Sequence, residues 1–172
     1  MMYGKQRRAR RELANGVRGA EEGCSMAPFR VRVQCSANAP KRSTLGAMTT
    51  YRGSCHCGRI RFEVEAEIDH VRVCDCSICH RRGALNFRVP KEALRLLTPW
   101  ESLSLYQWGT MTAKDYFCAA CGILPFRRPS DPTPREMKDG VESFDGWAVN
   151  VRCLECVDAN ALPVKRIYGS QI

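Results

Sequence analysis

Apolar and polar residues alternate in several short stretches of the chain. In residues 59–65 every second side chain is apolar and charged side chains fall between them, as in a strand that is buried on one face. Residues 147–154 alternate in the same way, with Trp147, Val149 and Val151 on one face. The same criterion predicts shorter strands at residues 70–73, 85–89, 94–97, 103–108 and 113–118.

Many short strands separated by turn signals predict a mainly β domain of packed antiparallel sheets. Helical periodicity is weak, and only residues 91–97 could form a helical turn. Residues 125–134 contain four prolines. Because proline lacks the backbone donor that a sheet needs, we expect a loop there and not a central strand.

Residues 1–47 have a different composition, rich in Arg, Gly, Ala and Ser and without sustained periodicity. Such a segment is predicted to be a disordered basic tail, and we assign no metal role to Cys24 or Cys35 within it. The tail is either an extension upstream of a true start at Met48 or an Arg-rich transit peptide, although its three glutamates weigh against the second interpretation. Residues 48–172 form the one predicted domain.

The formal net charge of the 172-residue chain is +9, and most of it lies in the tail, which has ten Lys and Arg against three Glu. The remaining domain is nearly neutral, so we expect no nucleic-acid surface on it. The N-terminus lacks the apolar run of a signal peptide, and no stretch is long and apolar enough to span a membrane. We therefore expect a cytoplasmic protein with reduced cysteines and no membrane partner.

Two of the cysteine pairs among the eleven cysteines run directly into a glycine. These pairs are Cys55 with Cys57 and Cys118 with Cys121. A glycine at this position lets the backbone turn so that amide groups point at the metal-bound sulfur. Together the pairs predict a closed, structural zinc site with four sulfur ligands. Two disulfides are the alternative, which a reducing compartment disfavours.

A separate triplet, Cys74, Cys76 and Cys79, offers only three sulfurs. Three protein ligands with one exchangeable position are typical of a catalytic zinc site. The alternative is a second structural site completed by His80 or Cys153. The sequence from Cys76 to His80 also matches the pattern for covalent haem attachment, which would require export and leave Cys74 unexplained.

The charge of the triplet favours one kind of chemistry. Zinc with three thiolates has a formal charge of −1, so it lowers the pKa of a bound water less than a three-histidine site does. It can still keep a thiol deprotonated near neutral pH, which favours thiol activation over hydrolysis. Arg81 and Arg82 follow the triplet and are candidates to offset its charge or to bind a substrate carboxylate.

The order and spacing of the cysteine motifs over roughly residues 49–160 resemble the glutathione-dependent formaldehyde-activating enzyme family, which includes centromere protein V. The matching motifs are GSCHCG (53–58), CDCSICHRRG (74–83), YFCAACG (116–122) and AVNVRCLE (148–155). The resemblance implies an Mss4-like β fold with two zinc ions. It also implies that Cys55, Cys57, Cys118 and Cys121 hold the structural ion and that Cys74, Cys76 and Cys79 hold the catalytic one.

By the same resemblance, the expected activity is that of a carbon–sulfur lyase or synthase that joins glutathione and formaldehyde, or a related small aldehyde, into S-hydroxymethylglutathione. The expected partners are then a small-molecule thiol and an aldehyde. The alternative is a non-enzymatic two-zinc binding module. Cys156 departs from the family pattern, in which glycine is expected, and Cys153 is expected to be a buried, inert thiol.

Overall fold

The computed structural model describes residues 48–171, so the predicted disordered tail at residues 1–47 lies outside the described residues. None of the helices in the described part of the chain has the length and apolarity needed to cross a membrane. The strands and helices of this part are β1 (Thr49–Ser54), β2 (Arg61–Ala66), β3 (Val71–Cys74), α1 (Ser77–Arg82), β4 (Asn86–Pro90), β5 (Leu94–Leu96), β6 (Leu103–Tyr106), β7 (Lys114–Cys118), β8 (Phe126–Arg128), α2 (Pro134–Lys138), β9 (Gly146–Asn150) and β10 (Val164–Ile167).

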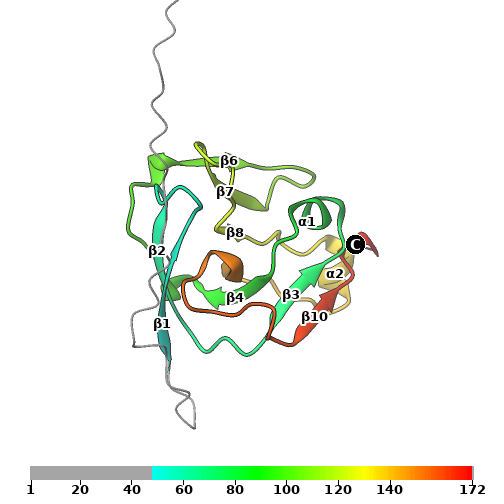
Figure 1. Cartoon of the computed structure of the whole chain (residues 1–172). Helices are drawn as coiled ribbons and strands as arrows, with labels where there is room; N and C mark the ends of the chain where they lie inside the picture. The colour runs from blue at the N-terminus through cyan, green and yellow to red at the C-terminus, as the bar shows by residue number, and fades with distance from the viewer. Residues whose placement is uncertain (1–47, 172) are drawn as a thin grey trace, which may run out of the picture.

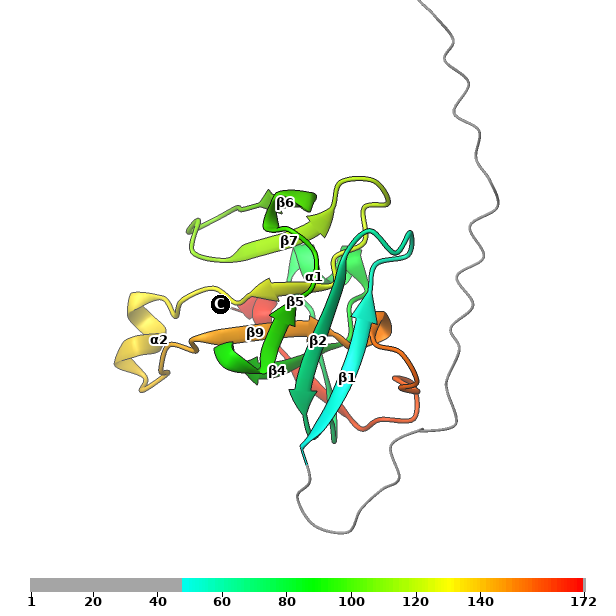
Figure 2. The ribbon, with the colours of Figure 1, turned by 90° about the vertical axis from the view of Figure 1, so that its left-hand side faces the viewer.

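The strands form two packed sheets, so the predicted mainly β fold is confirmed. The smaller sheet has the strand order β1-β2-β5, and the larger has the order β10-β3-β4-β9-β8-β7-β6. Figure 2 shows the smaller sheet lying across one face of the larger one. Neighbouring strands are antiparallel except β10, which pairs in parallel with β3.

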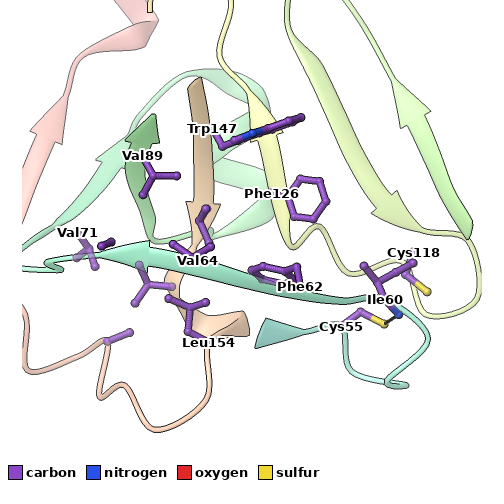
Figure 3. Packing of buried hydrophobic residues seen from close by; sticks show 14 residues of the cluster. Cys55, Ile60, Phe62, Val64, Val71, Val89, Cys118, Phe126, Trp147 and Leu154 are labelled. Atoms are coloured by element: carbon purple, nitrogen blue, oxygen red, sulfur yellow. Dashed lines mark hydrogen bonds between the residues drawn. The ribbon is translucent and has the colours of Figure 1, made fainter. Parts of the chain in front are cut away.

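The hydrophobic core lies between the two sheets. Alternation along β2 directs the fully buried side chains of Phe62 and Val64 toward the larger sheet (Figure 3). There the ring of Phe62 packs edge to face on Phe126, with the ring centroids 5.4 Å apart, and Trp147 packs beyond it on Phe126. Aromatic side chains therefore supply much of the apolar area that joins the sheets.

The opposite face of the larger sheet is polar. Phe126 of β8 pairs with Val149 of β9 on the core side, and the next pair, Arg127 with Ala148, lies on the other side. Arg88 of β4 is also paired with Ala148, so arginines from β4 and β8 flank one small residue. The alternation that builds the core on one face thus creates a positively charged surface on the other.

The prediction of a loop throughout residues 125–134 is wrong, because Phe126–Arg128 forms β8 inside the larger sheet. The prolines Pro125 and Pro129 flank this short strand, so its own backbone N–H groups remain available to β7 and β9. Pro125 also helps to join β8 to β9, since its carbonyl accepts a 2.8 Å hydrogen bond from the N–H of Asn150.

The predicted strand at residues 147–154 is shorter than expected. It ends at Asn150, whose side-chain oxygen accepts a hydrogen bond from the N–H of Arg152 and caps a 3-10 turn, Val151–Cys153. The possible helical turn in residues 91–97 resolves into a 3-10 turn, Lys91–Ala93, followed by β5.

Candidate active site and metal centres

Four cysteines meet at one end of the core. Cys55 and Cys57 lie in the turn after β1. Cys118 is the last residue of β7, and Cys121 lies in the turn that follows (Cys55 and Cys118 are labelled in Figure 3). All four sulfurs lie within 4.8 Å of one another, and the Sγ atom of Cys57 is 3.5 Å from that of Cys55 and 3.6 Å from that of Cys118. Sulfurs around a tetrahedral zinc ion are about 3.8 Å apart. The donor set and its spacing therefore fit zinc.

The turns that carry these cysteines share one backbone design. Gly58 and Gly122 both adopt positive φ angles, 72° and 73°. Their N–H groups bond back to the carbonyls of Cys55 and Cys118, over 3.0 and 2.8 Å. The N–H of Ile60 also donates to the sulfur of Cys55 at 3.3 Å. The glycines after the cysteine pairs thus close the turns, as the sequence predicted.

The second cluster consists of Cys74 at the end of β3, Cys76 just before α1, and the buried Cys79 within α1. Their sulfurs also lie within 4.8 Å of one another, and no other Cys, His, Asp or Glu of residues 48–171 joins the group. The structure therefore gives no support to a site completed by His80 or Cys153. All seven thiols of the two clusters are free, which argues against disulfides.

Each cluster contains thiols of unequal acidity. Burial raises the pKa of Cys55 in the first cluster and of Cys79 in the second to about 12. Burial also disfavours ionisation of Cys76 and Cys121, but hydrogen bonds to their sulfurs outweigh it, lowering the pKa of Cys76 and bringing that of Cys121 to about 6. Binding of a metal ion to either cluster therefore releases protons from the buried thiols.

A cavity of about 350 Å³ adjoins the triplet, a size typical of pockets that take small ligands. Its floor is the polar face of the larger sheet. Its walls come from the loop after β6, the segment between β8 and α2, and α2 itself. The residues of the floor are Arg72, Asn86, Arg88, Arg127 and Ala148.

The C-terminal segment follows β10, which lies beside β3 (Figure 1), and it packs against the triplet. The carboxylate of Asp75 accepts hydrogen bonds from the N–H and the hydroxyl of Ser170, both over 2.8 Å, and these lower its pKa. A Cβ atom on Gly169 would lie 2.5 Å from the sulfur of Cys74. Asp75 is thus a structural anchor, and Gly169 is required by close approach; no motif in the sequence indicates this contact.

A buried carboxylate connects the triplet to the sheet. Asp115 is fully buried and forms ion pairs of 2.6 Å with Arg82 and 2.7 Å with Arg127. Arg127 also donates a hydrogen bond to the sulfur of Cys79 over 3.4 Å. Asp115 therefore holds in place the guanidinium of Arg127, which faces the triplet.

Arg81 and Arg82, the arginines expected to bind substrate, lie outside the residues that line the cavity. Arg81 donates to the carbonyl of Ser77 on the exposed side of α1. Arg82 is engaged by Asp115 and lies over the ring of Tyr106, with its guanidinium carbon 5.8 Å from the centroid.

Sequence reasoning missed the arginines that do line the cavity, Arg72, Arg88 and Arg127. A signal existed in β4, because Asn86 and Arg88 alternate with apolar residues. The apolar positions of this alternation predict the core, whereas its polar positions face the cavity.

Cys153 and Cys156, near the C-terminal end of the matched motifs, belong to neither cluster. Burial raises the pKa of Cys153 to about 12, and its sulfur lies 3.9 Å from the carbonyl oxygen of Leu124, as expected for an inert thiol. Cys156 has a φ angle of 59°, the left-handed conformation that favours glycine. This explains why glycine is expected at its position.

The sequence profile of the glutathione-dependent formaldehyde-activating enzyme family matches residues 50–145, which span both cysteine clusters. The chain belongs to this family. The resemblance found in the cysteine motifs is thereby confirmed, and membership supports glutathione-dependent formaldehyde activation as the general chemistry.

Among solved structures, the chain is similar to a Rhodobacter sphaeroides protein determined as a structural genomics target. The two are 36% identical, and the match covers 66% of this chain and 99% of that one with a TM-score of 0.55. The part of this chain that matches therefore corresponds to nearly the whole of that neighbour.

Proposed function

We propose that the protein is a zinc-dependent carbon–sulfur lyase or synthase that adds glutathione, or a related thiol, to formaldehyde or a related small aldehyde. The observation that carries this proposal is the triplet of sulfurs at the edge of the cavity. Cys74, Cys76 and Cys79 line the cavity, whereas none of the four cysteines of the other cluster does. Family membership supplies the general chemistry.

The reaction balances without an oxidant or a cofactor that carries electrons. The thiol sulfur attacks the carbonyl carbon of the aldehyde, so that a carbon–sulfur bond forms and the carbonyl π bond breaks. The thiol proton ends on the new hydroxyl oxygen, through water, and S-hydroxymethylglutathione is the product when the partners are glutathione and formaldehyde. The lyase direction reverses these steps.

The two clusters have different roles in this proposal. Cys55, Cys57, Cys118 and Cys121 would hold a structural zinc ion, and Cys74, Cys76 and Cys79 a catalytic one. A bound zinc ion at the triplet supplies the positive charge that keeps a substrate thiol deprotonated near neutral pH.

The protein's own residues prepare this site. Arg127 places its positive charge beside the triplet, where it offsets part of the negative charge of three thiolates. The C-terminal segment around Gly169 packs closely against Cys74. The cavity leaves the other side open for the thiol and the aldehyde.

The test is the rate of S-hydroxymethylglutathione formation, measured by NMR exchange spectroscopy with ¹³C-labelled formaldehyde and zinc-loaded protein. We expect exchange well above the spontaneous rate, and we expect Cys76→Ser to return it to that rate while the protein remains folded. Equal rates with and without the fully metallated protein would retire the formaldehyde reaction.

A further inference from the structure

Three arginines converge on the cavity floor from different strands, and their charges are not equally balanced. Arg127 of β8 forms an ion pair with the buried Asp115, which it shares with Arg82. Arg72 of β3 and Arg88 of β4 form no ion pair with any of residues 48–171. Guanidinium groups that lie close together without an ion-pair partner of their own make a favourable place for an anion.

The environment of Arg88 shows how close these charges are. Partial burial, followed by the charges of Arg72 and Arg127, lowers its pKa from the ordinary value. The guanidinium carbon of Arg88 lies 4.9 Å from the centre of the Phe144 ring, which supports the side chain without neutralising it. The cluster is therefore held in place with uncompensated positive charge.

Asn86 adds a neutral polar group between the two unpaired arginines. It is paired with Arg72 across β3 and β4, and it precedes Arg88 by two residues on the same face of β4. Its side chain lines the cavity, only 8% of the residue is exposed, and its carboxamide oxygen has no hydrogen-bond partner within the described residues. Buried amide oxygens without partners are uncommon, and this one, beside two arginines, indicates a polar ligand that brings an N–H or O–H donor as well as an anionic group.

The acidic residues of the cavity do not neutralise the arginines, because they lie on the α2 side and two of them are engaged there. The carboxylate of Glu136 accepts hydrogen bonds from the N–H and the hydroxyl of Thr133 at the start of α2, both over 2.8 Å. The carboxylate of Asp131 accepts one from Ser143 over 3.1 Å. Glu142, the third acidic residue, forms no ion pair with any of residues 48–171.

We propose that Arg72 and Arg88 form a subsite that binds a carboxylate of the thiol substrate, with Asn86 beside them to accept a hydrogen bond from an N–H of the same molecule, and that the subsite selects carboxylate-bearing thiols over neutral ones. This inference rests on the proposed function, in which the triplet receives the substrate sulfur. Arg72 and Cys74 are two residues apart on one face of β3, or about 7 Å along the strand. A small peptide thiol spans that separation between its sulfur and its terminal carboxylate, so one molecule reaches both places.

Binding of S-methylglutathione tests the subsite without any reaction, because its sulfur is blocked and cannot act as a thiolate. Isothermal titration calorimetry compares the zinc-loaded wild type with the double variant Arg72→Gln/Arg88→Gln. We expect the variant to bind at least about tenfold more weakly, since each charge-assisted hydrogen bond to a carboxylate is stronger than a neutral one. Arg166→Gln, an exposed change on β10 outside the cavity lining, is the control and should bind as the wild type does.

The dimethyl ester of S-methylglutathione separates charge from shape. It should bind the wild type as weakly as the double variant binds the acid, and the double substitution should not weaken it further. Equal binding of acid and ester by the wild type, or undiminished binding of the acid by a folded double variant, would overturn the subsite. The rate assay with formaldehyde gives its result independently of these binding measurements. If that assay shows no acceleration while the acid binds more tightly than the ester, the proposed reaction is wrong and the subsite is supported.

Discussion

Arg127 donates a hydrogen bond from Nη1 to the Sγ atom of Cys79 over 3.4 Å. The same guanidinium forms an ion pair through Nε with Asp115, a carboxylate that is completely buried. One arginine thus links a charge inside the sheet to a sulfur at the cavity. Bonds from N–H donors to ligand sulfurs orient a metal site and tune its charge, so Arg127 acts on the triplet as a positioning residue.

Replacing Asp115 with Asn should destabilise the protein strongly. The change keeps the shape of the side chain but leaves Arg82 and Arg127 without their shared negative charge. Loss of one partner of a buried ion pair costs about 3 kcal/mol. Urea denaturation followed by tryptophan fluorescence measures this change in the free energy of unfolding.

Asp145→Asn is the matched control for that experiment. Asp145 pairs with Arg128, but two thirds of its side chain is exposed, 67%. An exposed ion pair contributes less than about 1 kcal/mol. Equal losses in the two variants would show that Asp115 does not hold a buried charge network.

Most strands of the fold could be predicted from sequence because burial on one face leaves a period of two. The strands β2, β3, β4, β5, β6 and β7 all overlap predicted ranges. β8 could not be predicted, since its prolines lie at its ends and a proline-rich segment reads as a loop. β10 was missed because its residues are mostly exposed and its pairing with β3 depends on the tertiary fold.

The helices were missed for a different reason: each is too short to show a helical stripe. α1 has six residues and ends at Gly83, which adopts a left-handed conformation. α2 has five residues and is specified by its start, where Thr133 and Glu136 form reciprocal capping bonds next to Pro134. This capping signal, T-P-R-E at residues 133–136, is present in the sequence.

For the site, cysteine spacing predicted which sulfurs meet, since each short motif places its ligands on one turn. It could not predict the cavity floor, because Arg72, Arg88 and Arg127 come from three strands whose neighbours are set by sheet order. Arg81 and Arg82, which adjoin the triplet in sequence, lie outside the residues that line this cavity, and their role in substrate binding stays a prediction.

Substitution of single ligands should separate the roles of the two clusters. Cys118→Ser removes a sulfur that is 99% buried against the core, so it should lower the free energy of unfolding by about 4 kcal/mol through loss of the structural metal. Cys76→Ser removes a less buried ligand at the start of α1, where serine is a favoured cap, so stability should change by less than about 1 kcal/mol. Thermal melts followed by circular dichroism measure both, and equal collapse of the two variants would contradict the assignment.

Gly169→Ala should impair metal binding at the triplet and leave the four-cysteine site unaffected. The added methyl group would lie 2.5 Å from the sulfur of Cys74, so the C-terminal segment or the sulfur must move. We expect zinc bound per protein, measured by mass spectrometry of the metal, to fall toward half while the melting temperature stays within a few degrees. Tyr168→Phe, at an exposed position of the same segment, adds no bulk and should keep the full zinc content. A full complement of zinc in Gly169→Ala would show that the contact of Gly169 with Cys74 does not constrain the triplet.

The most direct test of the central claim is the visible absorption of the cobalt-substituted protein during titration with glutathione. The claim is that the triplet binds a metal ion with one position open to a substrate thiol, while the four-cysteine site is closed. We predict a saturable increase in the charge-transfer absorption from thiolate to cobalt in the wild type, absent in Cys76→Ser. An unchanged spectrum of the fully loaded wild-type protein at saturating glutathione would contradict the account.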